Sequence, residues 1–171
     1  MNKNIVLIGL MGSGKSTIGK CLAEKTSMEF FDTDELIIQK AGKPISKIFE
    51  DAGEPFFRDL ESEAIEEVSK KQNAVISTGG GAVLRDENME NLKKSGILFF
   101  LQASPETLYE RVKDDKSRPL LRGDDPAGIL RRILIARTPF YEQANFNINT
   151  ENSTVEQVCE EILRLYYGHS N

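Results

Sequence analysis

A glycine-rich segment near the start of the chain has the residue types and the spacing of a phosphate-binding loop. Residues 9–17 read GLMGSGKST, which fits the pattern G-x-x-x-x-G-K-[ST], and they follow the apolar run 5–8. Glycines let the backbone curl so that its N–H groups point at anionic oxygens, and the dipole of the following helix strengthens that field. Lys15 can reach the β- and γ-phosphates, and the Ser16 hydroxyl suits Mg²⁺. The segment predicts a nucleoside triphosphate, bound by Gly12, Ser13, Gly14, Lys15, Ser16 and Thr17.

Two aspartates follow the second apolar run of the sequence. Many phosphate-loop enzymes carry an acid that organises Mg²⁺ at the end of a further strand. The run 74–77 ends without an acid, so we predict that Asp32, directly after the run 29–31, replaces it and acts through a bound water. Asp34 is suited to accept a proton from an attacking hydroxyl or to orient it. The alternative is that both aspartates only end a strand and cap a helix.

Arginines and a glycine run supply candidates for a second ligand. A guanidinium pairs with a carboxylate through two parallel hydrogen bonds, so Arg58 and Arg137 are candidates for gripping a substrate anion. Glu61 lies one helical turn after Arg58 and could hold its guanidinium in position. Three consecutive glycines at 79–81 favour a ligand that lies against bare backbone, with a tight turn as the alternative. The predicted substrate-binding set is Asp34, Arg58, Gly79, Gly80, Gly81 and Arg137.

Two segments interrupt the regular alternation of apolar runs and helical patterns. Residues 113–125 are charged and contain glycine, which is typical of a mobile lid. Within it, Arg118 or Arg122 could neutralise charge on a transferred phosphoryl group as an arginine finger does. Arg111, on the preceding helix, is predicted to pack on the adenine face by cation–π contact. Residues 34–60 exceed a simple crossover and predict a substrate-binding insertion. An ordinary surface excursion is the alternative for both segments.

The scaffold that must position these residues is an α/β sheet. Continuous apolar runs separated by helical patterns predict parallel strands covered on both faces, at 5–8, 29–31, 74–77, 97–101 and 146–149. Ligands bind at the carboxyl ends of such strands, so the three segments after the first three runs should meet. We also predict that Ser104 caps a helix, that Pro139 stops another, and that Ser153 and Glu156 form a capping box.

Size and charge limit the class of protein. The chain has 171 residues, of which 39% are hydrophobic and 29% charged, and this predicts one globular domain over 1–171. The formal net charge of −5 argues against broad binding to nucleic acid or acidic membranes. No apolar run reaches membrane length, so a cytoplasmic location is expected. Cys21 and Cys159 are expected to be reduced and buried, and a monomer is the default.

The segments taken together resemble the shikimate kinase family over essentially the whole chain. The matching segments are 9–17, Asp32-Thr33-Asp34, Phe57-Arg58, 79–81, 118–121 and 137–141. The resemblance implies a P-loop fold like that of nucleoside-monophosphate kinases, with a five-stranded parallel sheet in the order 2-3-1-4-5, flanked by helices. It also implies MgATP-dependent phosphorylation of the 3-hydroxyl of shikimate, within chorismate and aromatic amino-acid biosynthesis. Asn145 and Asn149 depart from the family, which often has aspartates near the ends of the last strand.

The resemblance further implies a role for each site residue. Lys15 and the loop amides hold the phosphates, while Ser16 ligates Mg²⁺ and Asp32 supports the metal through water. The catalytic set is Asp34 as the base, Lys15, and Arg118, which closes from the lid onto ATP. The substrate carboxylate is gripped by Arg58 and Arg137, and the glycines around Gly80 contribute backbone contacts.

Two other functions stay open at this stage. One is a related kinase on the same fold that acts on gluconate or a nucleoside monophosphate. The other is a nucleotide-binding sensor without catalysis, although a sensor needs no proton acceptor such as Asp34. A GTP switch is disfavoured because the chain has no Asn-Lys-x-Asp segment to read guanine.

Overall fold

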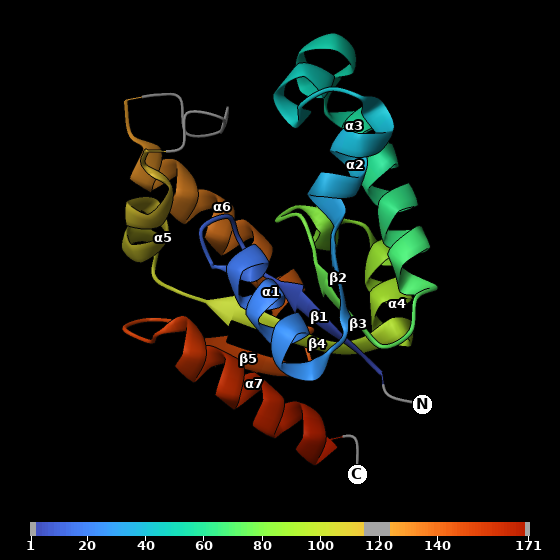
Figure 1. Cartoon of the computed structure of the whole chain (residues 1–171). Helices are drawn as coiled ribbons and strands as arrows, with labels where there is room; N and C mark the ends of the chain where they lie inside the picture. The colour runs from blue at the N-terminus through green and yellow to red at the C-terminus, as the bar shows by residue number, and fades with distance from the viewer. Residues whose placement is uncertain (1–2, 115–123, 170–171) are drawn as a thin grey trace.

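Apolar strands form one parallel sheet between two layers of helices (Figure 1). The computed structural model describes residues 3–114 and 124–169. Its sheet has the order β2-β3-β1-β4-β5 with every pairing parallel, which confirms the predicted topology. The strands are β1 (Asn4–Ile8), β2 (Glu29–Asp32), β3 (Ala74–Ser77), β4 (Gly96–Gln102) and β5 (Phe146–Asn149).

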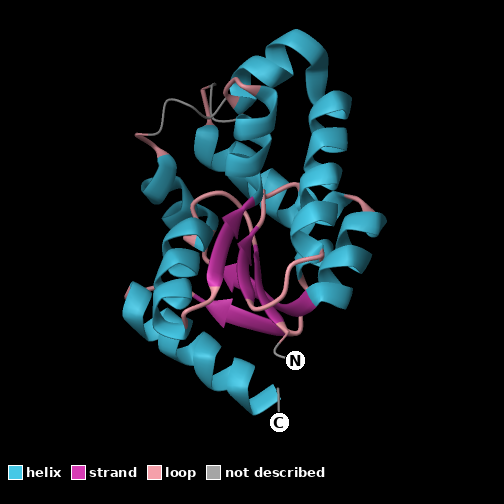
Figure 2. Ribbon diagram, turned by 45° about the vertical axis from the view of Figure 1, so that its right-hand side comes forward, coloured by secondary structure: helices cyan, strands magenta, loops and turns pink. Residues whose placement is uncertain are grey.

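Helices cover both faces of this sheet (Figure 2). They are α1 (Lys15–Thr26), α2 (Thr33–Ala41), α3 (Ile45–Ser69), the 3₁₀ turn η1 (Ala82–Leu84), α4 (Asp86–Ser95), α5 (Pro105–Val112), α6 (Pro126–Tyr141) and α7 (Val155–His169). Side chains of β1 alternate between two cores: Val6 packs with residues of α3–α6, and Leu7 with residues of α1 and α7. Burial of both faces explains why β1, β3 and β4 are apolar at nearly every position.

Strand register brings the candidate site residues to one edge of the sheet. Leu7 of β1 and Asp32 of β2 are both in register with Ser77 of β3. The loops that follow these strands therefore leave the sheet side by side. Ligand sites in parallel sheets form at this carboxyl edge.

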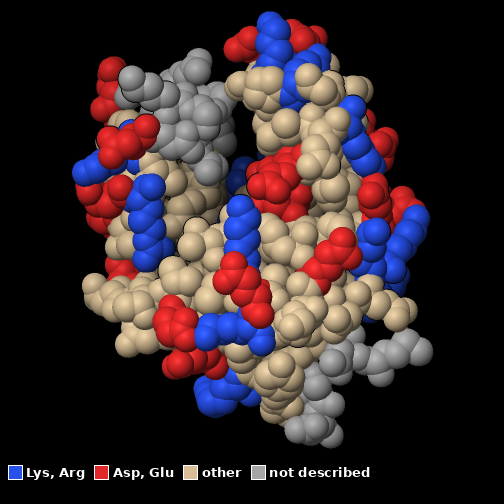
Figure 3. Space-filling model, viewed as in Figure 1, with Lys and Arg blue, Asp and Glu red and all other residues tan. Residues whose placement is uncertain are grey.

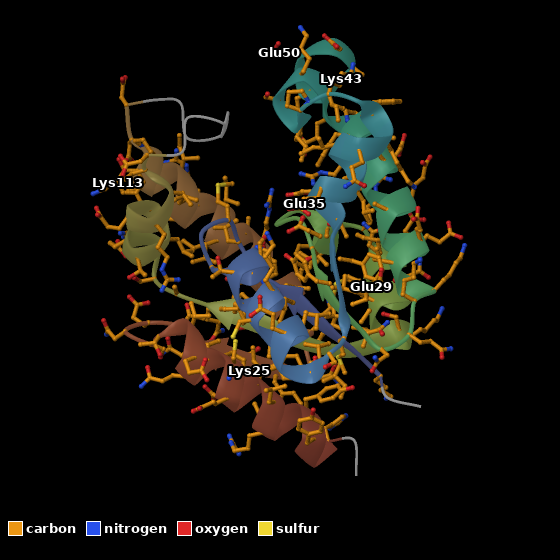
Figure 4. The ribbon with its side chains drawn as sticks, viewed as in Figure 1. Lys25, Glu29, Glu35, Lys43, Glu50 and Lys113 are labelled. Atoms are coloured by element: carbon orange, nitrogen blue, oxygen red, sulfur yellow. The ribbon has the colours of Figure 1, made fainter. Side chains whose placement is uncertain are left out.

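Helix α2 and the first part of α3 form a lobe that rises beyond the carboxyl edge of the sheet (Figure 1). We call it the α2–α3 lobe, and the predicted insertion 34–60 falls within it. It has a small core of its own, formed by Ile37, Ile48, Phe57 and Ala64. At Gly53 the backbone leaves the helical region (φ 80°, ψ 176°), which bends α3 within the lobe. Figure 4 places Lys43 and Glu50 at the tip of the lobe and Lys113 at the end of α5, on the other side of the view.

The prediction that Pro139 stops its helix is wrong, because α6 continues to Tyr141. A proline removes one backbone donor, whose acceptor four residues earlier is the carbonyl of Ile135. The Ile135 residue is 68% exposed, so water can solvate that turn. The helix therefore carries both Arg137 and Tyr141 on consecutive turns.

Helix caps follow the sequence in one case and differ by one residue in another. Ser104 caps α5 as predicted, since its hydroxyl accepts from the Thr107 N–H at 3.2 Å. The predicted capping box at Ser153 and Glu156 is wrong, because the reciprocal pair is Thr154 with Gln157.

The two cysteines are free, with Cys159 buried and Cys21 half-buried. Over residues 3–114 and 124–169, no helix combines the length and apolarity needed to cross a membrane.

Candidate active site

The carboxyl edge of the sheet opens into a cavity of about 850 Å³. Figure 3 shows the hollow beside the α2–α3 lobe. Most of the residues predicted from the sequence line this one cavity: Gly12, Ser13, Gly14, Lys15, Ser16, Thr17, Asp32, Asp34, Arg58, Gly79, Gly80, Gly81, Arg111 and Arg137. The predicted arginine fingers, Arg118 and Arg122, and most of the predicted lid 113–125 lie outside the described residues.

The phosphate-binding loop is closed around the ammonium group of Lys15. That group donates to the Gly9 carbonyl at 2.8 Å and to the Leu10 carbonyl at 3.1 Å, and its side chain is buried. Gly12 has a φ of +80°, and a Cβ there would lie 2.8 Å from the Leu108 carbonyl. The loop thus needs glycine both for its conformation and for its contact with α5. A buried cation at the start of α1 makes this end of the cavity suited to phosphate oxygens.

Arg111 joins this loop to the segment after β5. Its guanidinium donates to the Gly12 carbonyl at 3.2 Å and to the Thr150 carbonyl at 3.0 Å. These bonds hold the side chain at the cavity wall, where Thr150 and Ser153 also lie. The contact of Arg111 with adenine stays a prediction.

Ser16 and Asp32 place two oxygen donors in contact at the cavity wall. The Ser16 hydroxyl donates to Asp32 Oδ2 at 2.6 Å. Asp32 Oδ1 accepts from the Asp34 and Glu35 N–H groups, so this aspartate also caps α2. Asp32 therefore caps a helix and can also support a metal, the two roles that the sequence suggested as alternatives. Hydroxyl and carboxylate oxygens are the donors that Mg²⁺ prefers, and the pair fits such an ion.

Each residue of the glycine run leaves room for a different part of the site. A Cβ on Gly79 would lie 2.9 Å from Asp34 Oδ1 and 2.7 Å from Glu61 Oε1, and one on Gly80 would lie 3.6 Å from Arg137 Nη1. A Cβ on Gly81 would overlap the Arg58 guanidinium. The run therefore lets two acids and two arginines approach the same stretch of backbone.

Arg58 is held by two carboxylates. Its Nη1 donates to Glu61 Oε2 at 2.8 Å, which confirms the predicted partner. Its Nε and Nη2 both donate to Glu54 Oε1, at 3.2 and 3.0 Å. Burial raises the pKa of Glu61, and the charges of Arg58 and Arg137 oppose this rise. Sequence reasoning missed Glu54, although its place four residues before Arg58 on a helix was a usable signal.

Comparison with known proteins identifies the relatives of this chain. The family model described as shikimate kinase matches residues 11–166. The chain belongs to the shikimate kinase family. It is 48% identical over 169 residues to the shikimate kinase of Thermodesulfovibrio yellowstonii, spanning 99% of this chain and 98% of that protein. It is 49% identical over 164 residues to that of Caldicellulosiruptor bescii, spanning 96% and 95%.

A solved structure supports the same assignment. The shikimate kinase of Acinetobacter baumannii, solved in complex with shikimate, superposes with a TM-score of 0.94 at 38% identity. The match covers 98% of this chain and 94% of that one. Family, fold and cavity therefore agree.

Replacing Gly79 with alanine should lower kcat/KM by at least about tenfold, since displacing a reacting group by an ångström is costly. The added methyl would sit against the carboxylates of Asp34 and Glu61, and both would have to move. Steady-state kinetics with shikimate and ATP measures the loss. Gly168→Ala is the control, because nothing lies within 4 Å of a Cβ there. Wild-type kinetics in the Gly79→Ala protein would show that this close approach is unimportant.

Proposed function

We propose that the chain transfers the γ-phosphoryl group of ATP to the 3-hydroxyl of shikimate, giving shikimate 3-phosphate and ADP in chorismate biosynthesis. The observation that carries the proposal is one cavity, in a member of this family, that holds a phosphate-binding loop at one end and paired arginines at the other. Asp34 lines the same cavity, on the first turn of α2. The enzyme is proposed to be cytoplasmic and monomeric, and to bind neither nucleic acid nor membranes.

In-line phosphoryl transfer needs positioning and charge stabilisation more than covalent chemistry. Lys15 and the N–H groups of the loop hold the β- and γ-phosphates in this proposal. Arg58 and Arg137 bind the substrate carboxylate, and backbone groups of residues 79–81 contact the acceptor. Asp34 orients the attacking hydroxyl and accepts its proton. Arg118, in the segment outside the described residues, is proposed to close onto ATP.

Mg²⁺ would be held by the Ser16 hydroxyl and, through water, by Asp32. When bound, the ion supplies positive charge to the β- and γ-phosphate oxygens. No cluster of three or more His, Cys, Asp or Glu side chains suited to a metal occurs within 3–114 and 124–169. The remaining ligands of the ion would therefore come from ATP and water.

The two rival functions predict different acceptors. A nucleoside monophosphate would need groups for a second base, whereas two arginines beside a glycine run suit a small hydroxy acid. A coupled assay of ADP release with shikimate, gluconate and AMP separates the possibilities. We expect shikimate to be used at least about 100-fold faster than the others, since an acceptor hydroxyl displaced by about an ångström can cost about 10²-fold in rate. Faster turnover of gluconate or AMP would contradict the proposal, and no ADP with any acceptor would favour a sensor.

Replacing Arg58 with alanine should raise the KM for shikimate by about 100-fold and leave the KM for ATP within about twofold, because a charge-assisted bidentate contact is lost on one substrate. Arg58→Lys should recover little of this, since an ammonium cannot form the planar fork. Steady-state kinetics with each substrate varied gives both constants. Arg131→Ala, on the exposed side of α6, is the control. Equal rises in both KM values would show that Arg58 does not bind the substrate carboxylate.

A further inference from the structure

One buried side chain at the cavity contacts the site through a hydroxyl that the proposed chemistry does not use. Tyr141, the last residue of α6, is fully buried, and its ring stacks on Phe100 of β4 with centroids 4.8 Å apart. Its hydroxyl donates to the Gly80 carbonyl at 2.5 Å. Stacking would be served equally by phenylalanine. The hydroxyl adds the link between α6 and the glycine run, and it also interacts with the Arg137 side chain one turn earlier.

This link fixes the orientation of one peptide group. In a trans peptide the carbonyl and the following N–H point in opposite directions, so holding the Gly80 carbonyl toward the core turns the Gly81 N–H away from it. Within the described parts of the chain, that N–H donates to no protein acceptor. Gly81 lines the cavity against the Arg58 guanidinium. The peptide thus presents a donor beside the proposed carboxylate-binding arginine.

Glycines cannot fix such a peptide by themselves. They have the widest range of backbone conformations and no side chains to pack. Burial raises the pKa of Tyr141 to about 12, with the Arg137 charge opposing the rise, so the phenol remains a hydrogen-bond donor at any working pH. Arg137 lies one turn earlier on the same helix, with its Nη1 3.6 Å from the Cβ position of Gly80. Consecutive turns of α6 therefore carry both Arg137 and the Tyr141 hydroxyl that holds the Gly80–Gly81 peptide.

We propose that Tyr141 is a positioning residue for the acceptor substrate, holding the Gly80–Gly81 peptide in register with Arg137 and Arg58. The inference rests on the proposed function, because the acceptor it positions is shikimate. In this proposal Tyr141 does not contact the reacting atoms and acts only through the peptide that it holds. We expect its effect to fall on the acceptor, because the hydroxyl bonds the glycine run, although the Cβ position of Gly80 also lies 3.5 Å from the Gly9 carbonyl oxygen and the Met11 nitrogen of the phosphate-binding loop.

The test is Tyr141→Phe, which keeps the ring and removes only the hydroxyl. We expect the KM for shikimate to rise about five- to tenfold, because one hydrogen bond that orders the site is lost, with the KM for ATP unchanged within about twofold. Tyr166→Phe is the matched control: Tyr166 is also buried, and its hydroxyl donates to the Lys3 carbonyl at 2.6 Å on the other face of the sheet. It should lower the melting temperature comparably and leave both KM values at wild-type levels.

Unchanged KM values in Tyr141→Phe, or equal rises in both, would overturn the inference. A wild-type protein that does not phosphorylate shikimate would instead contradict the proposed function. A second measurement uses the wild-type protein alone and holds even if the variant does not fold. In a titration with shikimate followed by amide NMR, the Gly81 resonance should shift, and a Gly81 signal that does not move would also overturn the inference.

Discussion

Replacing Asp34 with asparagine is expected to lower kcat by about 10³-fold, within the range for loss of a general base. Asparagine keeps the shape and size of the side chain and cannot accept the proton of the attacking hydroxyl. Asp34 lies on the first turn of α2, and its carboxylate faces the Cβ position of Gly79 at 2.9 Å. The variant should therefore fold normally and still bind ATP. Steady-state kinetics, with thermal unfolding as a check of the fold, measures both effects.

The matched control for this variant is Asp86→Asn. Asp86 also lies on the first turn of a helix, is exposed, and is not among the residues that line the cavity. It should retain wild-type kcat. If Asp34→Asn kept kcat within about threefold, far less than general-base loss produces, the proton would have to leave by another route.

Replacing Lys15 with methionine should lower kcat by at least about 10²- to 10³-fold, the usual cost of deleting one charge-stabilising donor. The ammonium is buried within the loop and bound to the carbonyls of Gly9 and Leu10. Methionine has a similar length and keeps the packing of the side chain. A phosphate-transfer assay at saturating ATP separates the effect on kcat from that on binding.

Lys20→Met on the same helix is the control for this change. Lys20 is largely exposed, and its closest acid, Glu35, is 4.0 Å away. We expect its kinetics to match the wild type. Near-normal kcat in Lys15→Met would show that the loop holds phosphate by its backbone alone.

Much of the fold could be predicted from the sequence, because short local patterns determine it and the same kind of pattern recurs along the chain. Strands buried on both faces must be apolar at nearly every position, and β1, β3 and β4 are. The phosphate-binding loop has a strict pattern because its backbone needs glycine at fixed places. The ends of β1, β2 and β3 then had to meet, because parallel strands share one carboxyl edge.

Several of the parts that sequence reasoning missed depend on contacts across the fold. Pro139 is tolerated because the carbonyl left without a donor faces an exposed side of α6, which no local pattern records. The Tyr141 hydroxyl donates to the Gly80 carbonyl, although the two residues are 61 positions apart in the chain. Asp32 was expected either to cap a helix or to support a metal, and only its two separately bonded oxygens show that one carboxylate fits both roles.

The most direct test of the central claim is to identify the product by ³¹P and ¹H NMR after incubating the purified protein with MgATP and shikimate. We expect one phosphomonoester signal, coupled to the proton at position 3 of the shikimate ring, in equal amount with ADP. ADP formed without this ester, or an ester at another hydroxyl, would contradict it.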